Sequence, residues 1–298
     1  MPRSTAAAIL ASLLAACAGP APSPNVPPSG AVEMAVTALD PAARYMHQKQ
    51  PVSANKPSRA AIADLAPSGK LRAAINFGNP ILATKDAATG EARGVSVDLA
   101  HELGRRLSVP VELVTYTAAG KVVEGLKSNE WDVGYFAIDP VRAVDTEFTG
   151  PYVVIEGAYM VRENSPIRSN DEVDRAGIRI VVGKGSAYDL YLSREIRKAK
   201  LERAPTSPAV TDMMIAQKFE VAAGVKQQLQ ADARRIPGLR LLDGRFMVIN
   251  QAMAVPKGRI EGARYLAAFV EDMKASGFVA DGLKRHAIEG ALVAPAGR

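Results

Sequence analysis

Cysteine is almost absent from this sequence of 298 residues, which contains a single one, Cys17. With no second cysteine, the chain cannot form an intramolecular disulfide. Histidine is nearly as rare, since only His47, His101 and His286 occur, and they are scattered without the spacing of a metal site. Ser186 has no recognisable base partner in the sequence, so a nucleophilic triad cannot be argued. We therefore expect no metal, no other cofactor and no catalytic residue.

Long apolar runs and concentrated basic segments are also missing. The apolar stretch at residues 6–16 is too short to span a bilayer. The formal net charge is +6, but the lysines and arginines are spread along the chain and do not alternate with aromatics, so nucleic acid is not an expected partner. This mild basicity suits an anionic ligand.

The N-terminus has the pattern of an export signal. Arg3 precedes the apolar residues 6–16, and the stretch ends in the sequence LAAC at residues 14–17. That ending resembles a bacterial lipoprotein box, which implies that residues 1–17 direct export and that a lipid on Cys17 anchors the protein to a membrane in the periplasm. The alternative is ordinary signal cleavage near the same small residues, which would release a soluble protein.

The rest of the chain divides into a tether and a folded body. Residues 18–59 are rich in proline, alanine and serine without a sustained period, which predicts a tether. From about residue 60 onward, strand patterns and helix patterns alternate. The predicted strands are residues 71–76, 111–116, 131–138, 178–182, 219–223, 239–242 and 246–255, and the predicted helices are residues 96–107, 120–128, 186–198, 210–217, 227–235 and 260–276. This alternation predicts an α/β fold with mainly parallel strands.

Residues 132–142, with the sequence DVGYFAIDPVR, hold the most informative candidate site. A short apolar strand ends at Asp139 and Pro140, which places Arg142 just beyond the C-terminal end of the strand. Ligands bind at that end of the strands in open α/β sheets. The guanidinium of an arginine is always charged, and its planar fork matches a carboxylate. The competing interpretation is a surface arginine that caps a turn.

Four segments of the body resemble one protein family. Residues 94–100 (GVSVDLA) are similar to its helix start G-F-x-V-D-L-A, and residues 124–132 are similar to its L-x-x-G-x-x-D turn. Residues 138–152 resemble its I-T-P-E-R-A segment with the following F-S-x-P-Y, and residues 183–186 resemble its glycine-rich helix start. In this order, behind a lipoprotein box, they resemble the type II periplasmic solute-binding proteins of extracellular family 3, which bind amino acids and related small polar solutes for ABC importers.

The resemblance implies a two-lobed, periplasmic-binding-protein-like α/β fold with two parallel-type sheets joined by two crossovers. The first lobe would comprise residues 60–158 and 254–298, and the second lobe residues 159–253. A small carboxylate-bearing solute would be held in the cleft between the lobes, and hinge closure would trap it. The implied partners are this solute and the permease of an ABC transporter, with the protein acting as a monomer.

The resemblance also assigns residues to the cleft. Arg142 matches the family arginine that grips the ligand carboxylate. Across the cleft, the backbone N–H groups of Gly185, Ser186 and Ala187 would bind the same anion at a helix N-terminus. A plain helix cap is the alternative role for this segment. A nucleotide-binding P-loop does not fit, because glycine rather than serine or threonine follows Lys184.

Several positions depart from the family pattern. The residues that align with its two ligand-binding acids, its hydroxyl residue, its threonine and its cleft aromatic are Asn76, Val225, Ala137, Asp139 and Asn79, in that order. Either Asp139 neutralises an α-ammonium or the ligand has none, because an unpaired ammonium buried beside Val225 would be costly. Asp139 could instead cap an Asx turn before Pro140. The nearby aromatics could line the cleft or belong to the core; they are Tyr135, Phe136 and Tyr188.

Two other functions fit the same residues. Cyclohexadienyl dehydratases resemble this family and bind a carboxylated substrate, so the chain could be a periplasmic enzyme with Asp139 as its cleft acid. It could also be a sensor component that presents its ligand to a membrane receptor. Asn250 and Gln251 interrupt a long apolar run and could lie in the hinge or the cleft. We favour a binding protein that serves an importer.

Overall fold

The computed structural model describes residues 56–297. The expected export signal, the lipidation site Cys17 and nearly all of the predicted tether lie outside the described residues. The described part begins with α2 (Arg59–Leu65), whose N-cap residue Ser58 accepts a hydrogen bond from the amide of Ala61 at 3.0 Å. None of the helices in this part has the length and apolar content needed to cross a bilayer.

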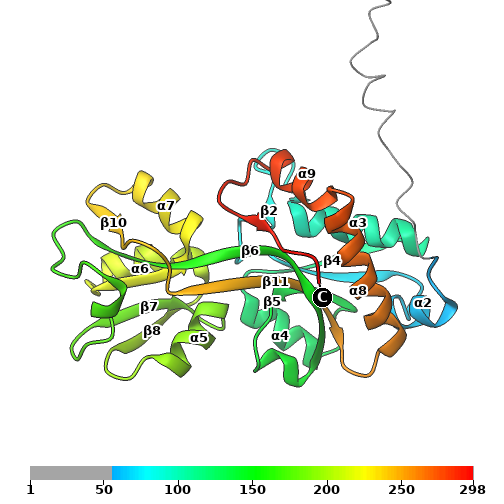
Figure 1. Ribbon diagram of the computed structural model, residues 1–298, viewed down its shortest axis with the longest axis horizontal. Coiled ribbons are helices and arrows are strands. Elements are labelled where there is room, and N and C mark those ends of the chain that lie inside the picture. The colour runs from blue at the N-terminus through cyan, green and yellow to red at the C-terminus, as the bar shows by residue number, and fades with distance from the viewer. Residues whose placement is uncertain (1–55, 298) are drawn as a thin grey trace, which may run out of the picture. The chain divides into compact units, whose positions relative to one another are not determined.

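A ten-stranded sheet runs through the described chain (Figure 1). Two groups of parallel strands form part of it: β4 (Val111–Tyr116), β1 (Leu71–Asn76) and β5 (Val133–Ala137) in one, and β9 (Val221–Val225), β7 (Arg179–Gly183) and β8 (Lys200–Ala204) in the other. Two long strands, β6 (Thr146–Arg162) and β11 (Met247–Pro256), lie between the groups. They pair antiparallel with each other, while β11 also pairs with β5 and β6 with β9. Backbone hydrogen bonding is therefore continuous between the two groups.

Short strands complete the sheets. β10 (Leu239–Leu241) and β12 (Leu292–Val293) both pair antiparallel with β6. β2 (Thr84–Lys85) and β3 (Ala92–Arg93) form a separate two-stranded hairpin.

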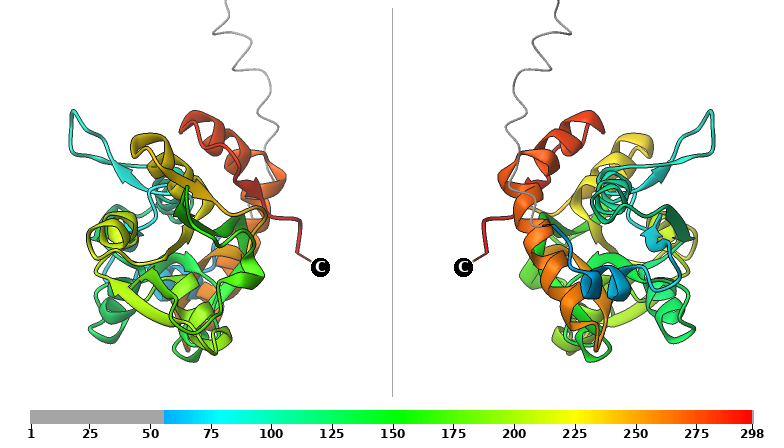
Figure 2. Two further views of the ribbon diagram at one scale, coloured as in Figure 1. Left: turned by 90° about the vertical axis from the view of Figure 1, so that its left-hand side faces the viewer. Right: turned by 90° about the vertical axis from the view of Figure 1, so that its right-hand side faces the viewer.

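We call each parallel group, together with the helices packed against it, a lobe. The first lobe carries α2, α3 (Val95–Leu107), α4 (Ala119–Lys127), α8 (Ile260–Ala275) and α9 (Phe278–Arg285), and the second carries α5 (Ala187–Glu195), α6 (Val210–Ala216) and α7 (Lys226–Arg235). Figure 2 shows α2 lying against α8, with which it is in contact. The lobe limits near residues 158 and 254 stay a prediction, because β11 pairs with β5 of one group, β6 pairs with β9 of the other, and β6 and β11 pair with each other.

The apolar core follows the alternation of side chains along the strands. In β1, Ile75 belongs to the main core, whereas Ala74 faces a smaller cluster with Trp131 and Phe136. Trp131 is fully buried, and its indole N–H donates to the carbonyl of Val122 at 2.8 Å. Full burial of a large apolar side chain contributes roughly 1.5–3 kcal/mol relative to exposure. This packing fixes the strands whose ends carry the candidate site.

Asp132, in the turn before β5, is a fully buried acid with two basic partners. Its carboxylate accepts hydrogen bonds from the backbone amide of Arg72 at 3.2 Å, from Nε of Arg72 at 2.9 Å and from Nη1 of Arg259 at 2.9 Å. Burial by itself would raise the pKa of Asp132, but the hydrogen bonds from Arg72 and Arg259 outweigh it and hold the pKa below its usual value. The carboxylate thus joins β1, the start of β5 and the start of α8.

The predicted order of strands and helices is confirmed, with ends that differ by a few residues. β8 was not expected, because its sequence KLERA is largely charged and lacks an apolar run. It pairs with β7 alone, at one end of the strand order, where charged side chains are favoured. α9 was also missed. Gly277 follows the end of α8 as predicted, and with a left-handed φ of 79° it is also the N-cap residue of α9. The two expected parallel groups are present, and the crossovers join them into one sheet.

Candidate functional site

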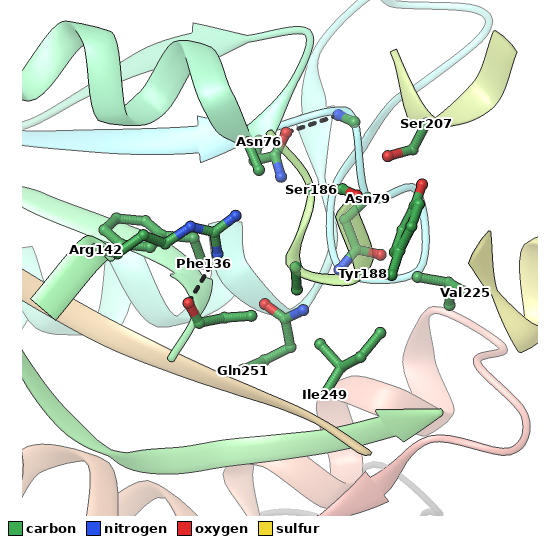
Figure 3. Close-up of a pocket in the computed structure, with 14 residues that line it drawn as sticks. Asn76, Asn79, Phe136, Arg142, Ser186, Tyr188, Ser207, Val225, Ile249 and Gln251 are labelled. Carbon is green, nitrogen blue, oxygen red and sulfur yellow. Dashed lines mark hydrogen bonds between the residues drawn. The ribbon is translucent and has the colours of Figure 1, made fainter. Parts of the chain in front are cut away.

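A small cavity lies where the C-terminal ends of β1, β5 and β9 meet the start of α5 (Figure 3). The residues that line it are Asn76, Gly78, Asn79, Ala119, Phe136, Ala137, Arg142, Ser186, Ala187, Tyr188, Ser207, Val225, Ile249 and Gln251. Its volume is about 30 Å³. That space holds roughly two water molecules, so even a small solute must shift lining side chains or enter while the lobes are apart.

Arg142 is the only charged residue among those that line the cavity. The chain leaves β5 at Ala137, turns at Pro140 and enters a single 3₁₀ turn, η1 (Arg142–Val144). The hydroxyl of Thr146 donates to the carbonyl of Arg142 at 2.7 Å and fixes this turn. Arg142 is only 3% exposed, so the predicted alternative of a surface arginine is wrong.

The guanidinium of Arg142 bonds to backbone carbonyls and not to an acid. Nη1 donates to the carbonyl of Ala137, and Nη2 donates to the carbonyl of Gly185 in the second lobe, both at 2.8 Å. The group lies 5.6 Å from the ring centre of Phe136, and its buried Nε has no hydrogen-bond partner. Burial lowers the pKa of Arg142 to about 10, although the charge of Asp139 acts in the opposite direction. A buried cation in this state favours the approach of an anion.

The start of α5 faces the same cavity but uses its amides differently from the prediction. The amide of Gly185 donates to Oδ2 of Asp189 at 2.8 Å, and the amide of Ser186 donates to the carbonyl of Gly183 at 3.0 Å. These two amides therefore have partners within the protein in this structure, and their role as anion donors stays a prediction. The amides of Ala187 and Tyr188 have no hydrogen-bond partner within the described chain. Ser186 acts as the N-cap, since its Oγ accepts from the amide of Asp189 at 3.0 Å.

Gly185 is one of the points at which the second lobe touches the first. Its φ of 69° lies in the left-handed region, which glycine adopts without strain. A Cβ at this position would lie 2.8 Å from Cα of Gly120 in the first lobe. Glycine is thus required twice, once for the turn and once for the approach of the lobes. The same approach brings the carbonyl of Gly185 to Arg142.

Asp139 is not among the residues that line the cavity, so its contact with a ligand stays a prediction. Its Oδ1 accepts from the amide of Val141 at 2.9 Å, which is the Asx turn that was the alternative prediction. Its Oδ2 accepts from Nη2 of Arg194 in α5 at 2.9 Å. Asp139 is 4% exposed, and each of its carboxylate oxygens has a hydrogen-bond partner from the protein. The residue therefore joins the lobes through an ion pair.

Tyr135 also lies outside the cavity, which corrects its prediction as a lining residue. It is part of the main core, with its ring edge-on to Tyr152 at 6.5 Å between centroids. Alternation along β5 explains the difference, because Phe136 projects from the other face and reaches the cavity. Tyr188 lines the cavity as well, and burial raises its pKa to about 12.

The structure brings most of the other predicted residues together. Those that line the cavity beside Arg142 are Asn76, Asn79, Ala137, Ser186, Ala187, Val225, Phe136 and Tyr188. Gln251 lines it too, whereas Asn250 does not, so the polar pair in β11 divides between two faces. Gly78, Ala119, Ser207 and Ile249 also line the cavity and were missed. Ser207 follows β8, and a strand that is not recognised gives no strand end from which to locate a site residue.

The family of the chain follows from its sequence as well as from its fold. Residues 71–287 match the family described as bacterial extracellular solute-binding proteins, family 3. No curated protein matches the chain. Among solved structures, a binding component of an ABC transporter from Wolinella succinogenes, complexed with lysine, is 22% identical with a TM-score of 0.64, and the match covers 73% of this chain and 95% of that one.

Two further solved structures share the fold. The solute receptor for L-cysteine of Neisseria gonorrhoeae is 22% identical with a TM-score of 0.67, and the match covers 77% of this chain and 94% of that one. An ancestral amino-acid-binding protein, described as a precursor of cyclohexadienyl dehydratase, is 19% identical with a TM-score of 0.64, over 75% of this chain and 98% of that one. The matched residues make up most of the folded body, and the chain therefore belongs to the bacterial extracellular solute-binding proteins of family 3.

Proposed function

We propose that this protein binds a small carboxylate-bearing solute in the cavity at Arg142 and delivers it to an ABC importer. The observation that carries the proposal is a buried guanidinium without an anionic partner: Arg142 is 3% exposed, and its Nε has no hydrogen-bond partner. Burying a charge is costly unless it is paired. A ligand carboxylate would supply the missing anion and accept hydrogen bonds from the remaining N–H groups.

Both lobes would hold this ligand. Ala187 and Tyr188 line the cavity and have free amides in the first turn of α5, where the helix dipole favours an anion. Arg142 belongs to the first lobe and α5 to the second. A carboxylate bound by both would couple ligand binding to closure.

Binding fits this cavity better than catalysis does. None of the residues that line it has a carboxylate, an imidazole or a thiol that could act as acid, base or nucleophile. Asp139, the candidate acid of a dehydratase, is instead paired with Arg194. The acid expected for a dehydration reaction is therefore held in an ion pair between the lobes.

The expected partner, an ABC importer, and the expected location in the periplasm are inferred from the family and from the N-terminal sequence. Members of the family are extracellular solute-binding proteins, and one structural relative is described as a component of an ABC transporter. We therefore expect a periplasmic monomer that meets a permease and carries a lipid on Cys17. Metabolic labelling with an alkyne fatty acid tests the lipid: the wild type should be labelled and Cys17→Ala should not. Absence of label on the wild type, or label on the variant, would contradict it.

Thermal unfolding in the presence of short carboxylates tests the binding function. The probes are lactate, pyruvate, malate and alanine, each measured with the wild type and with Arg142→Met. A ligand at a hundredfold excess over its Kd raises the apparent stability by about 2.7 kcal/mol. At least one carboxylate should stabilise the wild type and leave Arg142→Met unchanged. No stabilisation of the wild type, or equal stabilisation of both proteins, would refute the proposal.

A further inference from the structure

We infer that the natural ligand is a small hydroxy or oxo carboxylate that carries no ammonium group. The inference rests on the proposed function, because it takes the cavity at Arg142 as the carboxylate site. It goes beyond that function by naming the chemical class of the rest of the ligand. Three properties of the cavity carry it: its charge, the state of the neighbouring acids and the polar groups left without partners.

The charge of the cavity is positive. Arg142 is the only charged residue that lines it, and no aspartate or glutamate does. A carboxylate without an ammonium would neutralise this charge. A zwitterionic amino acid would bring its own positive charge as well, and the cavity would keep an unpaired buried cation. Such a cation is costly in a site with so little access to solvent.

Asp139 and Asp189, which are close in sequence to the lining residues Arg142 and Ser186, are not free to pair with a ligand ammonium. Asp139 is held by Arg194 at 2.9 Å and by the amide of Val141. Asp189 accepts from the amide of Gly185 at 2.8 Å and forms an ion pair with Arg203 at 3.0 Å. Both acids are 4% exposed. A ligand ammonium could use either of them only by breaking bonds that hold α5 and the lobes together.

An ammonium would need an acidic partner, but Val225 and Asn76, which line the cavity, are uncharged. Val225 ends β9 with an apolar side chain and is 5% exposed. Asn76 ends β1, and its Oδ1 already accepts from the amide of Gly78 at 2.9 Å. Figure 3 shows Val225 and Tyr188 on the side of the cavity away from Arg142. The part of a ligand opposite its carboxylate would therefore meet apolar or neutral groups.

Neutral hydrogen-bonding groups remain unused in the cavity. Oδ1 of Asn79 and the hydroxyl of Tyr188 are buried and have no hydrogen-bond partner among residues 56–297. Asn79 is 8% exposed and Tyr188 is 2% exposed. A hydroxyl on the ligand could donate to the first and accept from the second, and an oxo group could accept from Tyr188. Leaving these groups unsatisfied would cost free energy, so the ligand should carry a hydrogen-bonding substituent here, and a hydroxyl or oxo group supplies one without adding a positive charge.

Matched sets of acids that differ only at the second carbon test the inference. The sets are glycolate, glyoxylate and glycine; L-lactate, pyruvate and L-alanine; and L-malate, oxaloacetate and L-aspartate. Calorimetric titration of the wild type at pH 7 should give a hydroxy or oxo acid at least about tenfold tighter binding than the amino acid of its set. Arg142→Met should abolish this binding.

A single substitution should reverse the preference. Val225 is the N-cap residue of α7 and makes no side-chain capping bond there. Aspartate and asparagine are both favoured at an N-cap, so Val225→Asp and Val225→Asn should both keep α7. Only the aspartate adds a counter-charge for an ammonium. The affinity for the amino acid relative to the hydroxy acid should rise about tenfold or more in Val225→Asp compared with Val225→Asn.

The outcomes separate this inference from the function on which it rests. Tighter binding of the amino acid, lost in Arg142→Met, would overturn the inference and leave the carboxylate site standing. Equal ratios in Val225→Asp and Val225→Asn would also count against it. If no acid of any set binds the wild type, the inference falls together with the proposed function.

Discussion

Asp132 and Arg142 are buried charges of the first lobe whose surroundings differ. Asp132 is fully buried and accepts hydrogen bonds from Arg72 and Arg259, so its charge is balanced by the protein. Arg142 is 3% exposed, has no acidic partner and keeps an unpaired Nε. Both residues flank the same strand, β5, one before its start and the other after its end.

If the proposed function is right, this contrast separates a residue that holds the fold from one that binds a ligand. Removing one partner from a satisfied buried pair leaves an uncompensated charge, so such a pair supports stability. A buried charge whose partners are only backbone carbonyls costs stability and is tolerated where a ligand completes it. Substitutions at the two sites should therefore have opposite effects on unfolding and on binding.

The largest effect is expected for Asp132→Ala. It would leave Arg72 and Arg259 without their shared anion, and the free energy of unfolding should fall by about 3–5 kcal/mol. Urea denaturation followed by circular dichroism measures this change. Glu124→Ala is the control, because Glu124 forms an exposed ion pair with Lys121 and its loss should matter far less. Similar losses in the two variants would break the comparison.

Arg142→Met should show the reverse behaviour. Affinity for the carboxylate ligand should fall by about 150-fold or more and so leave no measurable binding, because at least two charge-assisted hydrogen bonds of roughly 1.5–3 kcal/mol each are lost. The free energy of unfolding without ligand should stay within about 1 kcal/mol of the wild type or rise, because an unpaired buried charge is removed. Calorimetric titration and urea denaturation measure the two quantities. A large loss of stability with intact affinity would contradict the assignment.

Gly185→Ala sharpens the comparison by acting on the contact between the lobes. Its Cβ would lie 2.8 Å from Cα of Gly120, so closure around the ligand should be hindered and affinity should fall by about tenfold. Gly90→Ala is the matched control, because Gly90 has a similar φ of 74° but nothing within 4 Å of the added Cβ. Both variants carry a backbone cost of roughly 1–2 kcal/mol. Equal affinities in the two variants would show that this contact is not needed for binding.

The smallest effect expected is the pH dependence of the Asp132 contribution. The pKa of Asp132 is depressed in the folded state, because the hydrogen bonds from Arg72 and Arg259 outweigh the opposing effect of burial. Its stabilisation is therefore fully present above the pKa of an unfolded aspartate, near about 4, and is lost as the pH falls through the lower folded pKa. The difference in unfolding free energy between the wild type and Asp132→Asn should be constant from pH 6 to pH 8 and shrink below about pH 4. A difference that grows on acidification would contradict this account.

The sequence was sufficient to predict the order of most helices and strands and the strand ends at which the cavity lies. Arg142 could be assigned because it combines a strand end with a family motif. The role of Asp139 could not be predicted, since its partner Arg194 lies 55 residues away and is brought to it only by the approach of the lobes. Tyr135 and Phe136 are adjacent, and the sequence does not say which of them faces the cavity.

The hydrogen-bond partners of Gly185 could not be predicted from the sequence either. Glycine-rich segments before a helix predict free amides, but a buried aspartate in the first turn of α5 takes the amide of Gly185. The carbonyl of the same residue then accepts from Arg142. Which of two backbone groups meets a ligand depends on packing that single-sequence patterns do not contain.

Measuring both binding and stability in two variants tests whether Asp132 serves the fold and Arg142 serves the ligand. Calorimetric titration of the tightest-binding hydroxy or oxo acid is carried out on Asp132→Asn and on Arg142→Met, with the unfolding free energy measured for both. The account predicts that Asp132→Asn is less stable but binds like the wild type, and that Arg142→Met is as stable as the wild type but does not bind. Normal binding by Arg142→Met, or loss of binding by folded Asp132→Asn, would contradict it.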